Sequence, residues 1–221
     1  APGQLSATSL WVDRSDPSRP FINPETQGLL PMRILHSTST DGGRTWGPPR
    51  QMDTTPHSAV SPCSSAIMPL AGDLLAQPYE HWKDYDDPSP ARPAARLRLS
   101  RDGGTTWPDF ETVAEHPDNA LAYWDQRLAI HPETGQLVAM FWTHDFTAGC
   151  DRDIHIAWGS PDGRTWSPPQ PTGLPGQHCQ PLALGGDSLA AVYTHRRDPP
   201  GIALSISHDY GQTWDRAQDL M

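Results

Sequence analysis

The residues best suited to chemistry in this sequence lie where the expected strands begin or end. The densest group is Tyr123-Trp124-Asp125-Gln126-Arg127, at the start of a strand expected over 124–130. Asp125 offers a carboxyl group that can exchange a proton, and Arg127 offers a planar guanidinium that can bind a carboxylate through two hydrogen bonds. Two alternatives stay open: the two side chains pair with each other, or strand alternation turns one of them outward.

Four more groups occupy comparable places. Arg196 and Arg197 follow a strand expected over 188–195, where they reach a ligand or are simply solvated. Tyr79-Glu80-His81-Trp82 ends another strand, with Glu80 as a second carboxylate and aromatic rings that stack on a ligand or pack in the core. His144-Asp145 ends a third strand, where the two residues contact a ligand or only each other. Gln177-His178 precedes a fourth strand and offers polar contacts.

Four copies of one acidic, glycine-rich sequence motif position these strand ends. The copies are Ser39–Trp46, Ser100–Trp107, Ser160–Trp166, which is one residue shorter, and Ser207–Trp214. The aspartate of each copy can accept N–H bonds inside its own turn, and glycine supplies the positive φ that a tight hairpin needs. The tryptophans are 61, 59 and 48 residues apart, which is the length of a four-stranded sheet with its loops. Since helical periodicity is nearly absent, the repeats predict an all-β propeller.

The motif resembles the Asp-box, or bacterial neuraminidase repeat, of the sialidase superfamily. The resemblance implies a sialidase-like β-propeller in which the boxes are structural turns. Blades are expected at approximately 1–55, 56–115, 116–172 and 173–221, whereas sialidases have six, so the sequence predicts part of a six-bladed ring that is incomplete at its C-terminus. The structural residues of the boxes are Asp41, Trp46, Asp102, Trp107, Asp162, Trp166, Asp209 and Trp214.

The resemblance also implies roles for the candidate residues. In sialidases three arginines bind the carboxylate of the sugar, an aspartate is the acid/base, and a tyrosine assisted by a glutamate is the nucleophile. On this basis Asp125 and Glu80 are the expected catalytic residues. The expected substrate-binding residues are Arg127, Arg196, Arg197, Tyr79, Trp124, His144, Asp145 and Gln177.

The sequence departs from the family pattern in two places. Arg33 lies in a segment that leads directly into a box, so we expect it in a third strand rather than at the carboxylate clamp. No tyrosine follows Tyr210, which itself lies inside a box. The nucleophile is therefore expected outside these residues.

Composition excludes several classes of function. A net charge of −10 and a pI near 5.3 make nucleic acid an unsuitable partner, because phosphate binding needs clustered Lys and Arg. No apolar stretch approaches the roughly 18 residues of a membrane span. The three cysteines lack Cys-x-x-Cys spacing and the ten histidines lack zinc-ligand spacing, so neither a metal nor a cofactor is expected. The chain opens on Ala1-Pro2 without Met, which suggests a removed leader and favours a secreted or periplasmic bacterial protein.

The function that the sequence predicts is that of an exo-acting glycoside hydrolase that releases a terminal acidic sugar, sialic acid, from glycoconjugates. Its partner is accordingly a carbohydrate. Two alternatives stay open, because a fold alone does not give a function. The first is a non-catalytic glycan-binding propeller, and the second is a propeller enzyme that acts on another acidic polysaccharide.

Overall fold

The computed structural model describes residues 3–57, 60–63 and 65–221, which form four antiparallel sheets. Blade 1 contains β1, β2 and β3, and blade 2 contains β4, β5, β6 and β7. Blade 3 contains β8, β9, β11 and β12, with the short β10 paired to β9, and blade 4 contains β13, β14, β15 and β16. The strands are β1 Leu5–Val12, β2 Met32–Ser39, β3 Arg50–Gln51, β4 Met68–Pro69, β5 Leu75–His81, β6 Ala94–Ser100, β7 Asp109–Glu115, β8 Leu121–Ile130, β9 Leu137–Asp145, β10 Cys150–Asp151, β11 His155–Gly159, β12 Gln170–Pro171, β13 Cys179–Gly185, β14 Ser188–His195, β15 Gly201–Ser207 and β16 Gln218–Asp219.

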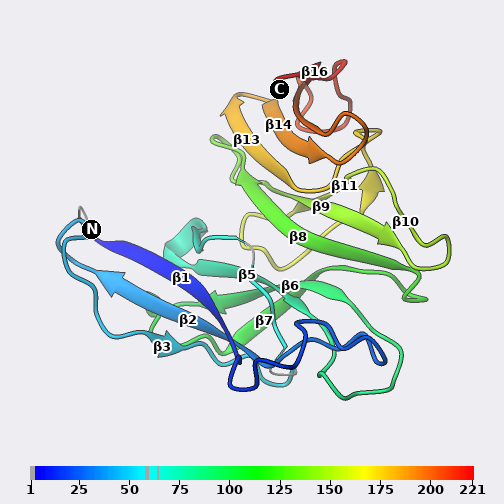
Figure 1. The fold of residues 1–221 in the computed structure, drawn as a ribbon. Coiled ribbons are helices and arrows are strands. Elements are labelled where there is room, and N and C mark those ends of the chain that lie inside the picture. The colour runs from blue at the N-terminus through cyan, green and yellow to red at the C-terminus, as the bar shows by residue number, and fades with distance from the viewer. Residues whose placement is uncertain (1–2, 58–59, 64) are drawn as a thin grey trace.

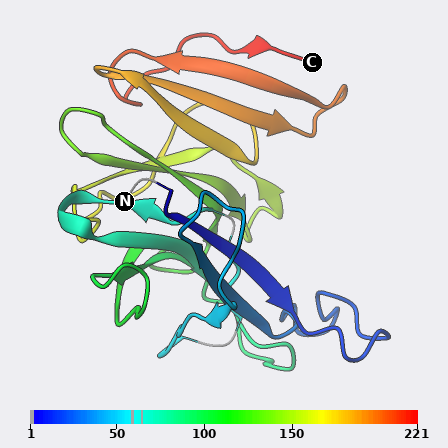
Figure 2. The same ribbon diagram turned by 90° about the vertical axis from the view of Figure 1, so that its left-hand side faces the viewer.

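The sheets follow one another in chain order as an arc of propeller blades (Figures 1 and 2). The predicted all-β, sialidase-like propeller with about four blades is confirmed. Each sheet is a meander of sequential antiparallel strands. The longer connections run over the face where the candidate residues lie. Within the described residues, no helix is long and apolar enough to cross a membrane.

The hydrophobic core lies between successive blades. Alternate residues of β6 and β9, including Leu97, Leu99 and Phe141, pack between blades 2 and 3 and are at most 1% exposed. The opposite side of β9 carries Val138 and Met140, which pack with residues of blade 4. This alternation makes each inner sheet apolar on both faces, as sheets covered on both sides require.

The Asp boxes are turns closed by their own side chains. Asp102 accepts hydrogen bonds from the Thr106 amide at 2.9 Å, the Thr106 hydroxyl at 2.6 Å and the Ser100 hydroxyl at 2.8 Å. These bonds lower the pKa of Asp102 to about 2. Asp41 and Asp209 make the same three contacts in their own boxes.

The third box, which is one residue shorter, bonds differently. Asp162 accepts from the Ser160 hydroxyl at 2.6 Å and from the Arg164 amide at 3.2 Å. The Thr165 amide donates instead to the Ser160 hydroxyl at 3.1 Å. The deletion therefore removes threonine from the contacts of the aspartate while the turn itself is kept.

The boxes also join one blade to the next. A Cβ atom on Gly104 would lie 2.6 Å from His36 Cε1 of blade 1, and one on Gly211 would lie 2.5 Å from Ile156 Cδ1 of blade 3. Glycine is thus needed both for positive φ and for close approach to the preceding blade. In blades 2, 3 and 4 the box follows the third strand, the short β10 not counted, and the second strand runs antiparallel to the third. The second strands therefore end on the face opposite the boxes.

Arg33 lies in β2, which runs directly into the first box. Its guanidinium lies over the Trp11 ring at 4.8 Å. Arg33 thus lies in the strand that leads into a box, as the sequence indicates, although this strand is the second of the three that the structure describes in blade 1.

Candidate functional site

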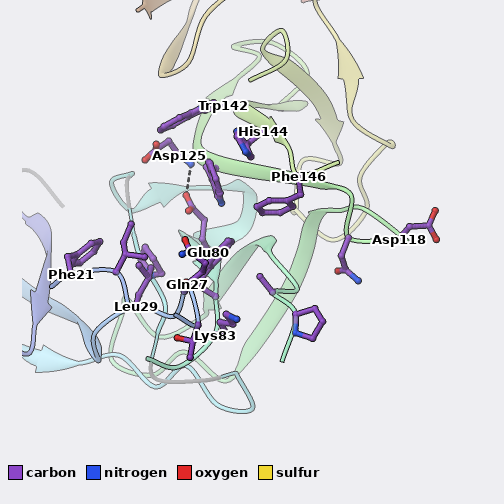
Figure 3. Close-up of a pocket in the computed structure, with 18 residues that line it drawn as sticks. Phe21, Gln27, Leu29, Glu80, Lys83, Asp118, Asp125, Trp142, His144 and Phe146 are labelled. Carbon is purple, nitrogen blue, oxygen red and sulfur yellow. Dashed lines mark hydrogen bonds between the residues drawn. The ribbon is translucent and has the colours of Figure 1, made fainter. Parts of the chain in front are cut away.

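A groove of about 810 Å³ opens on the face opposite the boxes, among loops of blades 1, 2 and 3. Figure 3 shows Asp125, Glu80, Trp142 and His144 on its walls. These residues stand at or near the ends of β5 and β9 and near the start of β8. Four sequence candidates line this groove together: Glu80, Trp124, Asp125 and His144.

Asp125 lies at a β-bulge in β8. The register passes from Trp124 opposite Trp142 to Arg127 opposite Met140, so Asp125 and Gln126 together face a single residue. Asp125 has φ of 50°, in the left-handed region that non-glycine residues rarely adopt. Such a conformation costs on the order of 1–3 kcal/mol and is concentrated at functional sites. The bulge re-aims the aspartate, which ordinary alternation would place differently.

Two side chains hold Asp125 in this conformation. Glu80 Oε1 accepts a 2.6 Å hydrogen bond from the Asp125 amide, drawn as the dashed line in Figure 3. His178 Nδ1 lies 3.0 Å from Asp125 Oδ2. Glu80 belongs to blade 2 and His178 precedes the first strand of blade 4, so three blades meet at this one aspartate.

Gln126, the second residue of the bulge, anchors it to blade 2. Its Nε2 donates to the carbonyl oxygens of Tyr79 and Arg96, both at 2.8 Å, and the side chain is fully buried. Sequence reasoning missed this residue. The signal that could have found it is a glutamine within a mostly apolar strand, next to the candidates Asp125 and Arg127, because a buried amide must find hydrogen-bond partners.

Aromatic rings form the floor beside Asp125. Trp124 lies edge-to-face with Trp142 at 5.3 Å and stacks on the His144 ring at 5.2 Å. Trp82 contacts Trp124 at 5.8 Å, and Phe146 contacts it at 6.0 Å. Trp142 and Phe146 were not among the expected binding residues, although Trp142 lies in the second half of β9 and Phe146 follows that strand. Trp82 follows β5 and belongs to the group Tyr79–Trp82, whose rings were expected either to stack on a ligand or to pack in the core.

His144, which lines the groove, is connected to blade 4 through the carboxylate of Asp151. Its Nδ1 lies 2.8 Å from Asp151 Oδ1, and Gln177 Nε2 donates to Asp151 Oδ2 at 2.9 Å. Burial raises the pKa of Asp151, but the hydrogen bonds from Gln177 and His144 outweigh this and leave the pKa lowered. The network fixes the His144 ring against Trp124.

The three expected arginines do not meet at Asp125. Arg196 and Arg197 line a second, smaller pocket of about 210 Å³ together with Gln177. The Arg196 guanidinium lies over the Trp142 ring at 5.2 Å. Arg127 is half-buried opposite Met140 and lines neither pocket. Trp142 lines the groove and carries Arg196 on its ring, whereas neither Arg196 nor Arg197 lines the groove itself.

Tyr79 and Asp145 also lie away from the groove. Tyr79 is 1% exposed, and its hydroxyl is hydrogen-bonded to His57 Nδ1 at 2.8 Å; burial raises its pKa to about 12. Asp145 accepts from the Thr147 and Ala148 amides at 2.9 Å and pairs with Arg152 at 2.6 Å. Both side chains have structural partners in the fold.

Within the part of the chain that the structure describes, no tyrosine or arginine lines the groove. Lys83 lines it, with Nζ donating to the Ser89 carbonyl at 2.6 Å. The described residues also contain no group of three or more His, Cys, Asp or Glu side chains that could hold a metal ion.

The BNR repeat-like domain model matches residues 10–221. The chain belongs to this family. No curated protein matches its sequence. This BNR repeat-like chain resembles a solved Dyadobacter fermentans protein of unknown function, with 20% identity, a TM-score of 0.71, and coverage of 98% of this chain and 60% of that one.

Two solved sialidases are also similar. The Hadza microbial sialidase Hz136 shows 19% identity and a TM-score of 0.67, with 97% of this chain and 44% of that one covered. The NanB sialidase from Streptococcus pneumoniae shows 10% identity and a TM-score of 0.65, with 99% and 50% covered. At these identities the likeness shows the fold, a sialidase-like propeller. The chain spans about half the length of these sialidases.

Proposed function

We propose that this chain carries the acid/base part of a glycoside hydrolase site, with Asp125 as the acid/base. The observation that carries the proposal is the left-handed Asp125 at the β8 bulge, held from two other blades by Glu80 and His178. A strained acid in a preformed groove is typical of a site selected for chemistry rather than for stability.

The chemistry needs one carboxyl group beside the glycosidic oxygen. The Asp125 carboxyl would donate its proton to that oxygen as the bond breaks, and would then accept a proton from the incoming water. Glu80 is the positioning residue, because its carboxylate bonds the Asp125 amide and so fixes the direction of the side chain. The indole rings of Trp124 and Trp142 would contact the apolar face of the sugar ring.

The sugar that we propose is a terminal acidic sugar, as in sialidases. The similarity to two solved sialidases supports this class of substrate. Lys83 is the cation that the described residues place in the groove, and it would meet the sugar carboxylate there. Arg127, Arg196 and Arg197 are not part of this proposal, because none of them lines the groove.

A second candidate function is non-catalytic glycan binding. It is favoured by the lining of the groove, in which the described part of the chain places several aromatic rings but no tyrosine hydroxyl and no arginine. Aromatic platforms bind sugars without any positioned nucleophile.

The test is an assay of the protein with 4-methylumbelliferyl N-acetylneuraminide and 4-methylumbelliferyl galactoside, alongside calorimetric titration with the corresponding methyl glycosides. Hydrolysis of the neuraminide supports the proposed function. Hydrolysis of the galactoside alone would support a glycoside hydrolase function but would contradict the proposal that the substrate is an acidic sugar. Binding without hydrolysis would favour the second candidate, and neither binding nor hydrolysis would refute both.

A further inference from the structure

The groove extends beyond Asp125 along a wall that sugar chemistry does not explain. The residues of this apolar wall are Phe21, Ile22, Leu29, Pro90 and Ala91. Figure 3 shows Phe21 and Leu29 on one side of the groove and Phe146 on the other, with Glu80 and Asp125 between these sides. The wall and the acid therefore belong to one continuous cavity.

The wall is exposed although it is apolar. Phe21 is 38% exposed and Ile22 is 48% exposed. Contiguous exposed apolar surface inside a cavity is typical of a binding site, because soluble proteins otherwise cover such surface. Aliphatic side chains such as Ile22 and Leu29 cannot satisfy sugar hydroxyls, and burying those hydroxyls unpaired is costly.

The wall is also rigidly built. The blade 1 loop that carries it is fixed to blade 2 by Trp82 Nε1, which donates to the Gln27 carbonyl at 2.8 Å. The Tyr85 carbonyl accepts from Asn23 Nδ2 at 2.9 Å and from Thr26 Oγ1 at 2.5 Å. The same loop approaches so closely at Gly28 that a Cβ there would overlap the backbone of blade 2.

An outer clamp reinforces this contact. Arg19 pairs with Asp86 at 3.0 Å, and its guanidinium lies over the Tyr85 ring at 3.9 Å. The apolar wall is thus formed before any ligand arrives, so a ligand does not have to order the loop.

From this arrangement we infer that the apolar wall is the subsite for the leaving group, and that the substrate carries an aromatic or alkyl aglycone next to its terminal sugar. The inference rests on the proposed function, since Asp125 must stand at the bond between sugar and aglycone. The sugar then lies over Trp124 and Trp142, where polar groups gather, and the aglycone lies against Ile22 and Phe21. This names the substrate as a glycoside of an apolar alcohol or phenol, not a free oligosaccharide.

The test compares three probes by calorimetric titration: 4-methylumbelliferyl N-acetylneuraminide, methyl N-acetylneuraminide and free 4-methylumbelliferone. The variant Ile22→Asn is matched by Leu182→Asn, since Leu182 is 47% exposed on β13 of blade 4, outside the groove. Titrations with the umbelliferyl glycoside use Asp125→Asn as background, so that it is not hydrolysed.

The expected result is that the umbelliferyl glycoside binds about tenfold more tightly than the methyl glycoside, because the aromatic group is buried. Ile22→Asn removes most of this advantage and most binding of free 4-methylumbelliferone, while Leu182→Asn keeps both. Equal affinity for the two glycosides, or an advantage that survives Ile22→Asn, would overturn the inference and leave the proposed function standing. If free 4-methylumbelliferone binds in a manner that depends on Ile22 and neither glycoside binds, the apolar wall would be supported as a binding site for aromatic groups. The proposed sugar-binding site beside Asp125 would then be refuted.

Discussion

The carboxylate of Glu80, on blade 2, accepts a 2.6 Å hydrogen bond from the backbone amide of Asp125, on blade 3. The bond crosses from one blade to the next and ends on a residue with φ of 50°. A charged acceptor makes this bond stronger than one between neutral groups. It therefore helps to keep a backbone conformation that the local sequence does not favour.

Removing this acceptor is expected to lower turnover without abolishing sugar binding. In Glu80→Ala we expect kcat to fall roughly 10- to 100-fold, since a hydrogen bond to a charged group contributes about 1.5–3 kcal/mol. Glu80→Gln keeps an oxygen that can accept the same amide, so it should restore most of kcat. Equal loss in both variants, measured as kcat and KM separately, would show that the charge of Glu80 matters and not its position.

The Asp boxes offer a matched pair for stability. Asp209 makes three side-chain contacts, whereas Asp162 in the shortened box makes two. In thermal unfolding we expect Asp209→Ala to lower Tm by about 2–4 °C more than Asp162→Ala does. Indistinguishable Tm values would mean that the extra threonine contacts contribute nothing. The pKa of Asp209 is lowered to about 2 in the folded protein. Its contribution to the free energy of unfolding is therefore fully present above pH 3.8 and is lost as the pH falls toward 2.

Close packing of boxes against the preceding blade can be tested at two adjacent glycines. Gly103 and Gly104 both have positive φ, but only a Cβ on Gly104 would meet another residue, His36. Gly103→Ala should cost about 1–2 kcal/mol for the left-handed backbone alone. Gly104→Ala should cost about 1–3 kcal/mol more, because the methyl group enters an occupied space. Chemical denaturation measures the difference, and equal costs would contradict the contact between blades.

Stability should depend on pH through His57. Burial, together with the charge of Arg96, lowers the pKa of His57 to about 4, against 6.5 for the free side chain. The unfolded chain therefore binds more protons between these values, so stability is full above pH 6.5 and is lost as pH falls toward 4. We expect His57→Gln to flatten the dependence of Tm on pH between pH 7 and pH 4.5. If Tm of His57→Gln depended on pH as steeply as Tm of the wild type, His57 would not be the source of the pH dependence.

Much of the fold could be predicted because the signals are local. A box carries its own hydrogen bonds, so Asp102 and Asp209 mark hairpins whatever surrounds them. Strand ends were equally visible, which is why Glu80, Trp124, Asp125 and His144 could be named before their meeting in one groove was seen.

Other features of the site depend on contacts between blades. The one-residue bulge at Asp125 breaks the alternation on which the direction of Arg127 was judged. The sequence could not show that Arg196 lies over the Trp142 ring and does not line the groove. The loop that joins β1 to β2 is mostly polar in sequence, yet it packs on blade 2 and places Phe21 and Ile22 in the groove.

The acid/base role of Asp125 is tested most directly by kcat/KM of Asp125→Asn on 4-methylumbelliferyl N-acetylneuraminide. The matched control is Asp215→Asn, which also removes an acid paired with a histidine, His208, at 3.4 Å, but on the exposed surface of blade 4. We expect a loss of about 10²- to 10⁴-fold in kcat/KM in Asp125→Asn, with methyl glycoside binding kept, and a rate close to wild type in Asp215→Asn. Wild-type turnover in Asp125→Asn would contradict the acid/base role.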